Sequence, residues 1–95
     1  MKQKFCLINK ENYTSGAVVG LDYALKHKSE WVDVPKELEI YLTAGYVKGV
    51  DHIVMKKKAY MLMKTYIMPE DGIILIIAVE STSGCDTIYD DSVTK

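Results

Sequence analysis

The sequence predicts a single α+β domain, residues 1–95, built on a mainly antiparallel sheet. Its length of 95 residues is that of one domain and is enough to bury a core without disulfides or metals. Apolar residues make up 48% and charged residues 26%, as in ordinary globular proteins. Residues 59–80 consist of two β-rich runs on either side of a turn signal, and other segments have apolar residues at helical spacing. We therefore expect a central hairpin with one or two helices packed on the sheet.

The first 28 residues predict a strand, a turn and a segment that fits two structures. Residues 4–9, KFCLIN, form an apolar run typical of a strand, and NKEN favours the turn after it. Residues 14–28 fit a helix with Thr14 or Ser15 as its N-cap and basic residues in its last turn. They also fit a strand, but that strand would carry Gly20 in its interior, where glycine weakens pairing. We favour the helix.

Residues 30–49 predict a short strand followed by a helix. Pro35 suits the first helical position, and the acids at 37 and 39 suit the positive end of the helix dipole. Gly45 or Gly49 would end the helix, and residues 52–55, HIVM, would open another strand. The residues that helical spacing places on one face of this helix are Val34, Leu38, Tyr41, Leu42 and Gly45.

The hairpin signal is the PEDG sequence at 69–72, between two β-rich runs. Proline presets the backbone at the start of the turn, and glycine suits the left-handed residue that closes it. A four-residue loop pairs Met68 with Ile73, and the same register then continues along both strands. The pairs that follow are Ile67 with Ile74, Tyr66 with Leu75, Lys64 with Ile77, and Leu62 with Val79.

This register predicts one apolar sheet face as the candidate interaction surface, because cross-strand partners share a face. Two strongly apolar sheet faces need more helical cover than the one or two predicted helices supply. An uncovered apolar patch usually marks an association site. The face consists of Tyr60, Leu62, Tyr66, Leu75 and Ile77, and its basic rim of Lys56, Lys58 and Lys64.

Two other interpretations of this face stay open. In the first, one helix covers each side of the sheet, the tyrosines belong to the core and the lysines form a solvated edge. In the second, the tyrosines stack on bases and the lysines contact phosphates of a nucleic acid. All twelve basic residues are lysine, however, and arginine is the residue that reads phosphates and guanine edges through two hydrogen bonds.

The net charge of −1 is unevenly distributed along the chain. Residues 1–47 carry six lysines and six acids, whereas residues 48–69 carry five lysines and a single acid. From residue 70 onward six acids face one lysine, so residues 84–95 read as an acidic, partly flexible tail. The basic middle and the acidic tail could pair with each other or serve two partners.

Signals for metal binding, phosphate binding or catalysis are weak. The spacing of Cys6, Cys85, His27 and His52 matches no zinc site, and we expect both thiols to be free and dispensable. YTSGAVVG and STSG offer amides and hydroxyls to a phosphate, but the first lacks the lysine of a P-loop. No nucleophile and base are placed together by a recognisable motif.

We therefore expect a small, non-enzymatic, cytoplasmic protein-interaction module, adaptor-like or inhibitor-like, that needs no cofactor or metal. Its partner would be another protein or a second copy of itself in a homo-oligomer, and its composition suits a virus or mobile element. The alternative is a binding module for nucleic acid or for a phosphorylated small ligand such as a nucleotide. The sequence predicts neither a signal peptide nor a membrane span.

Overall fold

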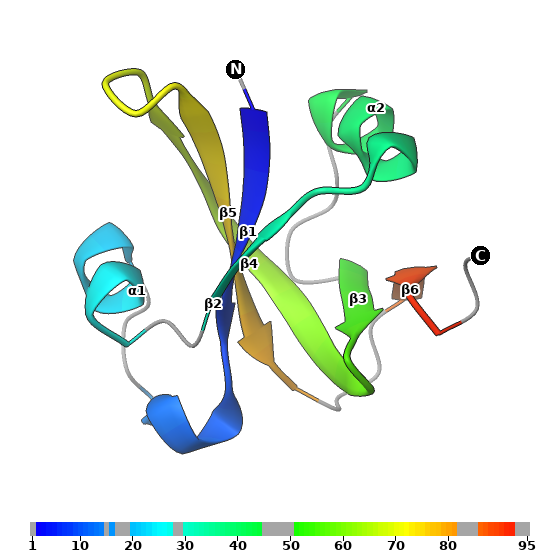
Figure 1. Ribbon diagram of the computed structural model, residues 1–95. Helices are drawn as coiled ribbons and strands as arrows, with labels where there is room; N and C mark the ends of the chain where they lie inside the picture. Colours follow the sequence, from blue (N-terminus) through cyan, green and yellow to red (C-terminus); the bar gives the residue numbers. More distant parts are fainter. Residues whose placement is uncertain are drawn as a thin grey trace.

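Six strands form one sheet in the computed structural model, in the order β2-β1-β5-β4-β3-β6 (Figure 1). The structure describes residues 2–14, 16, 20–27, 30–44, 51–81 and 86–92. Within these ranges two α-helices, α1 (Leu21–His27) and α2 (Lys36–Ala44), accompany the sheet, and the predicted α+β class is confirmed. The strands are β1 (Lys2–Ile8), β2 (Glu30–Asp33), β3 (Asp51–Met55), β4 (Lys58–Met68), β5 (Ile73–Glu80) and β6 (Asp86–Asp90).

The sheet is mixed rather than purely antiparallel. The pairs β1–β2, β3–β4 and β4–β5 are antiparallel, whereas β1–β5 and β3–β6 are parallel. The hairpin of β4 and β5 lies at the centre of the strand order, as predicted. Strand β6 covers five residues of the segment expected to be an acidic tail, and it pairs with β3 at one edge of the sheet.

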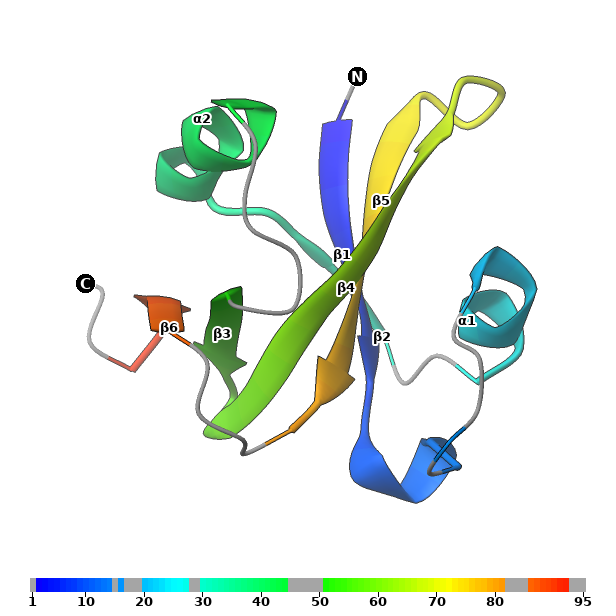
Figure 2. The ribbon, with the colours of Figure 1, turned by 180° about the vertical axis from the view of Figure 1, so that it is seen from behind.

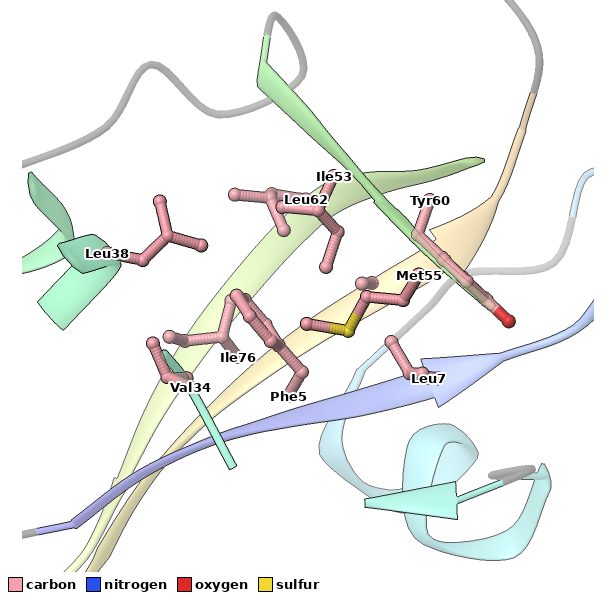
Figure 3. Packing of buried hydrophobic residues seen from close by; sticks show 10 residues of the cluster. Phe5, Leu7, Val34, Leu38, Ile53, Met55, Tyr60, Leu62 and Ile76 are labelled. Carbon is pink, nitrogen blue, oxygen red and sulfur yellow. The ribbon is translucent and has the colours of Figure 1, made fainter. Parts of the chain in front are cut away.

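One helix packs on each face of the sheet, so each face has its own core (Figures 1 and 2). Leu38 of α2 packs on one face and Ala24 of α1 on the other. The strand residues alternate between these cores, because successive side chains of a strand point to opposite faces. Figure 3 shows the α2 side, which contains Phe5, Leu7, Val34, Leu38, Ile53, Met55, Tyr60, Leu62, Ile76 and Ala78.

The helical interpretation of residues 14–28 is correct for Leu21–His27, but the predicted N-cap is not. The helix begins after Gly20, whose carbonyl oxygen accepts a hydrogen bond from the amide of Ala24 at 2.9 Å. Thr14 lies well before this start, and its amide donates to the hydroxyl of Tyr23 at 2.9 Å. Ser15 lies outside the described residues.

The second helix begins one residue later than the sequence predicted, at Lys36 instead of Pro35. The carbonyl oxygen of Pro35 accepts hydrogen bonds from the amides of Leu38 and Glu39, at 2.9 and 3.2 Å, so proline directly precedes the first helical residue. The two glycines expected to end α2 lie outside the described residues. None of the helices that the structure describes has the length and apolarity needed to cross a membrane.

The predicted hairpin register is confirmed from the loop to Lys64 and is wrong beyond it. Met68 pairs with Ile73 and Lys64 with Ile77, as the four-residue loop requires. A β-bulge then inserts Met63 as an extra residue, so Leu62 pairs with Ala78 instead of Val79. Because strand side chains alternate, a shift of one residue moves all of the preceding side chains to the opposite face.

Gly72 closes the hairpin loop with φ of 67°, a left-handed conformation that β-branched residues resist. We expect Gly72→Val to lower the free energy of unfolding by about 1 kcal/mol or more. Space is not the cause, since no heavy atom lies within 4 Å of a Cβ placed there. Gly72→Asn is the control, because asparagine tolerates this conformation, and it should cost less than valine. Equal midpoints for the two variants in urea would contradict the assignment.

The bulge predicts opposite sensitivities for two neighbouring residues of β4. Leu62 is fully buried in the α2-side core, whereas Met61 is half-buried on the other face. Leu62→Ser should therefore lower the free energy of unfolding by about 2–5 kcal/mol, and Met61→Ser by clearly less. Urea unfolding of both variants tests this, and a larger loss for Met61→Ser would mean that the register has no bulge.

Candidate interaction surfaces

The candidate face predicted from the register does not exist as one surface. The bulge at Met63 places Tyr60 and Leu62 in the core under α2. Tyr66, Leu75 and Ile77 belong to the core under α1, on the opposite side of the sheet. The residues expected to share a face are therefore divided between both faces.

These residues are also largely inaccessible. Leu62, Leu75 and Ile77 are fully buried, and Tyr60 is 3% exposed. Only Tyr66 is half-buried, and its hydroxyl lies 3.6 Å from the position that a Cβ on Gly20 would take, at the start of α1. The prediction of an uncovered apolar patch is wrong, because a helix covers each face and the residues serve as core.

The environment of Tyr60 explains its place at the rim of the α2-side core. Its hydroxyl donates a hydrogen bond to Oδ1 of Asn9 at 2.6 Å, and Figure 3 shows the ring lying beside Met55 with the hydroxyl at its outer end. Burial raises the pKa of Tyr60 to about 12, and the negative charges of Glu80, Glu30 and Glu11 add to this effect. A buried ring of this kind presents no face on which a nucleic-acid base could stack.

The predicted basic rim is divided between the turn that joins β3 to β4, which holds Lys56, and strand β4, which holds Lys58 and Lys64. Lys56 and Lys57 form this two-residue turn with φ values of 53° and 68°, a conformation that glycine and asparagine adopt more readily. The ammonium of Lys56 forms an ion pair with Glu30, and its backbone amide donates to Oδ2 of Asp91 at 2.9 Å. Lys58 and Lys64 are half-buried on β4. The acidic end of the chain therefore contacts the lysine turn.

The cysteines and histidines do not meet in a metal site. Cys6 is buried, and its thiol lies 3.8 Å from the carbonyl oxygen of Ala24, whereas Cys85 lies outside the described residues. His27 stacks on Tyr23 with ring centroids 4.2 Å apart, and Nε2 of His52 lies 2.8 Å from Oγ1 of Thr87. Among the described residues no three side chains of metal-binding type come together.

The structure exposes apolar side chains that sequence reasoning missed. Ile40 on α2 is 79% exposed, its neighbour Tyr41 is 39% exposed, and Ile67 near the hairpin tip of β4 is 67% exposed. Ile40 lies off the buried stripe of α2, two positions after Leu38, and this spacing was the signal that could have identified it. Two of these three residues are adjacent on one helix.

Acidic groups surround Tyr41. Its hydroxyl donates to Oδ2 of Asp51 at 2.9 Å, and this hydrogen bond, with burial and the charges of Asp51 and Asp86, raises the pKa of Tyr41. Asp86 opens β6 directly beside Asp51 in the sheet. Glu37 lies one helical turn before Tyr41 and is exposed. We call Glu37, Ile40, Tyr41 and Asp86 the α2–β6 surface.

The comparison with protein-family models, curated proteins and solved structures found no match. The arrangement of exposed and charged side chains is therefore the basis for any functional assignment. The α2–β6 surface combines exposed apolar side chains with carboxylates.

The hydroxyl of Tyr60 makes a testable contribution to stability. Tyr60→Phe removes the hydrogen bond to Asn9 and should cost about 1 kcal/mol at neutral pH. The pKa of this phenol rises from 10.0 to about 12 on folding, so the folded state holds the proton more tightly. The stabilisation is complete below the lower value and is lost as pH rises through the higher one.

Urea unfolding between neutral pH and about pH 12 measures this contribution. The wild type should lose stability steeply above about pH 10, and Tyr60→Phe should lack that part of the decline. Tyr13→Phe, which changes a ring packed edge-on against Tyr23, is the control and should keep the decline. Identical pH profiles for wild type and Tyr60→Phe would show that another group causes the loss.

Proposed function

We propose that the chain is a small, non-enzymatic protein-interaction module, adaptor-like or inhibitor-like, that docks through the α2–β6 surface. The observation that carries this proposal is the 79% exposure of Ile40 on a helix that buries Leu38 in the core. Covering a large exposed aliphatic side chain with another protein lowers the free energy, because apolar surface is removed from water. Tyr41 adds an aromatic ring with a polar end, a side chain that is enriched at protein interfaces.

A protein partner suits this surface better than a nucleic acid does. The charged groups around Ile40 and Tyr41 include the carboxylates of Glu37 and Asp86, which repel phosphates, and one exposed lysine, Lys36, a helical turn before Ile40. The turn formed by Lys56 and Lys57 is poorly suited to binding phosphates, since Lys56 already forms an ion pair with Glu30. The alternative of a binding module for nucleic acid or a phosphorylated small ligand therefore has less support.

A different protein also suits the surface better than a second copy of the chain. In a two-fold dimer built on this surface, the same patch meets itself. Carboxylates would then face carboxylates, which is unfavourable unless cations intervene. The expectation of a homo-oligomer stays a prediction, and sedimentation of the wild type tests it. The proposal includes a cytoplasmic location, where a buried cysteine thiol such as that of Cys6 stays reduced.

Two matched variants test the proposed docking surface. Ile40→Glu should abolish capture of the partner by the tagged protein in an extract of the source cells, because it places a charge where apolar contact is needed. Ile67→Glu, the same change at another exposed isoleucine on β4, should leave capture intact. Both sites are exposed, so thermal unfolding should confirm that each variant stays folded. Equal capture by the wild type and both variants would refute a docking role for Ile40.

A further inference from the structure

The two edge strands of the sheet differ in the way that their acidic residues are neutralised. Strand β2 forms one edge and has Glu30 and Asp33 at its ends. Asp33 is paired with Lys4 at 3.0 Å and Lys2 at 3.4 Å, and the hydrogen bond from Lys4 is the main cause of its lowered pKa. Glu30 is paired with Lys56. Lysines of the same chain therefore neutralise both acids of this edge.

Strand β6 forms the opposite edge of the sheet. Its first residue, Asp86, carries a negative charge that no ion pair with a lysine of the described residues neutralises. No lysine of the described residues lies within ion-pair distance of the Asp86 carboxylate, which is exposed. Its charge instead reaches the phenol of Tyr41 on α2. Asp91, just beyond the strand, accepts a hydrogen bond from the backbone amide of Lys56 rather than from an ammonium. The β6 edge is the more acidic of the two.

The backbone of β6 is also open on one side. Its ladder partner is β3, and the described part of the chain places no strand on the side away from β3. An open strand edge presents amide and carbonyl groups to which an extended segment can pair. Figures 1 and 2 show α2 and β6 at the same end of the molecule, and the hydrogen bond of Tyr41 to Asp51 connects α2 to the strand beside β6.

We infer that an extended segment of a partner protein, rich in lysine or arginine, adds to β6 as a further strand while its apolar side chains cover Ile40 and Tyr41. The inference rests on the proposed docking function and specifies the partner's chemistry. Main-chain hydrogen bonds along the edge supply affinity, and the charge of Asp86 selects basic side chains.

A second copy of the chain does not satisfy this requirement. Pairing β6 with the same strand of another copy would oppose two acidic edges. The lysine-bearing strand β1 is paired with β2 on one side and β5 on the other, so its backbone is not available to a neighbouring molecule. The described strands of a second copy therefore offer no open, lysine-bearing edge, and we place the segment in a different protein.

A designed peptide tests the inference directly. The probe is a fluorescein-labelled peptide of about ten residues that alternates lysine and valine, and its control carries a methyl group on every backbone nitrogen. The control keeps the charge and the side chains but cannot donate ladder hydrogen bonds. By fluorescence anisotropy at low salt, the methylated peptide should bind at least about tenfold more weakly. Amide shifts in NMR spectra should map the probe to β6 and α2.

Charge variants of the protein complete the test. Asp86→Asn should weaken binding of the probe about threefold, and Asp71→Asn, a matched change in the exposed hairpin loop, should leave it unchanged. Equal binding of the methylated and unmethylated peptides, or shifts confined to β2 or the hairpin, would overturn strand addition at β6. Absence of probe binding would also overturn it, while partner capture that depends on Ile40 would leave the proposed docking function standing.

Discussion

Burial of β5 on both of its faces is the constraint on which the rest of the structure depends. Apart from Ile74, every residue from Ile73 to Val79 is buried, and neighbouring strands satisfy the backbone of β5 on both sides. A strand of this composition at an edge would promote aggregation, so it must be central and must be covered above and below. The two short helices provide that cover, one on each face. Where the cover ends, near the hairpin tip, Ile74 and its partner Ile67 become accessible.

The bulge at Met63 determines which core receives the residues of β4 that precede it. Without the bulge, Leu62, Lys64 and Tyr66 would share one face, and Leu62 would leave the α2-side core. The extra residue sends Leu62 to the α2 side and leaves Lys64 on the face of Ile77, where it is half-buried. One inserted residue thus places Leu62 in the α2-side core, while Tyr66 stays with the α1-side core.

Local sequence signals predicted the elements that local chemistry determines. Loop length and turn residues were sufficient for the register between Lys64 and Met68, and Pro35 marked the start of α2. The bulge could not be read from strand spacing. Strand β6 was also missed, because Asp86–Asp90 has acids at both ends and becomes a strand through its pairing with β3. The predicted interaction face was wrong because its apolar residues form the two cores of the domain.

What remains for function is therefore the surface that the core does not need. Ile40 lies off the buried stripe of α2, is 79% exposed and belongs to neither core of the described residues. Acids of the β2 edge are tied to lysines, whereas Asp86 at the β6 edge stands close to Tyr41 and Asp51. Apolar side chains, carboxylates and an open strand edge thus occur together at one end of the sheet. The basic, extended protein segment that we propose as the ligand has a chemistry that matches all three.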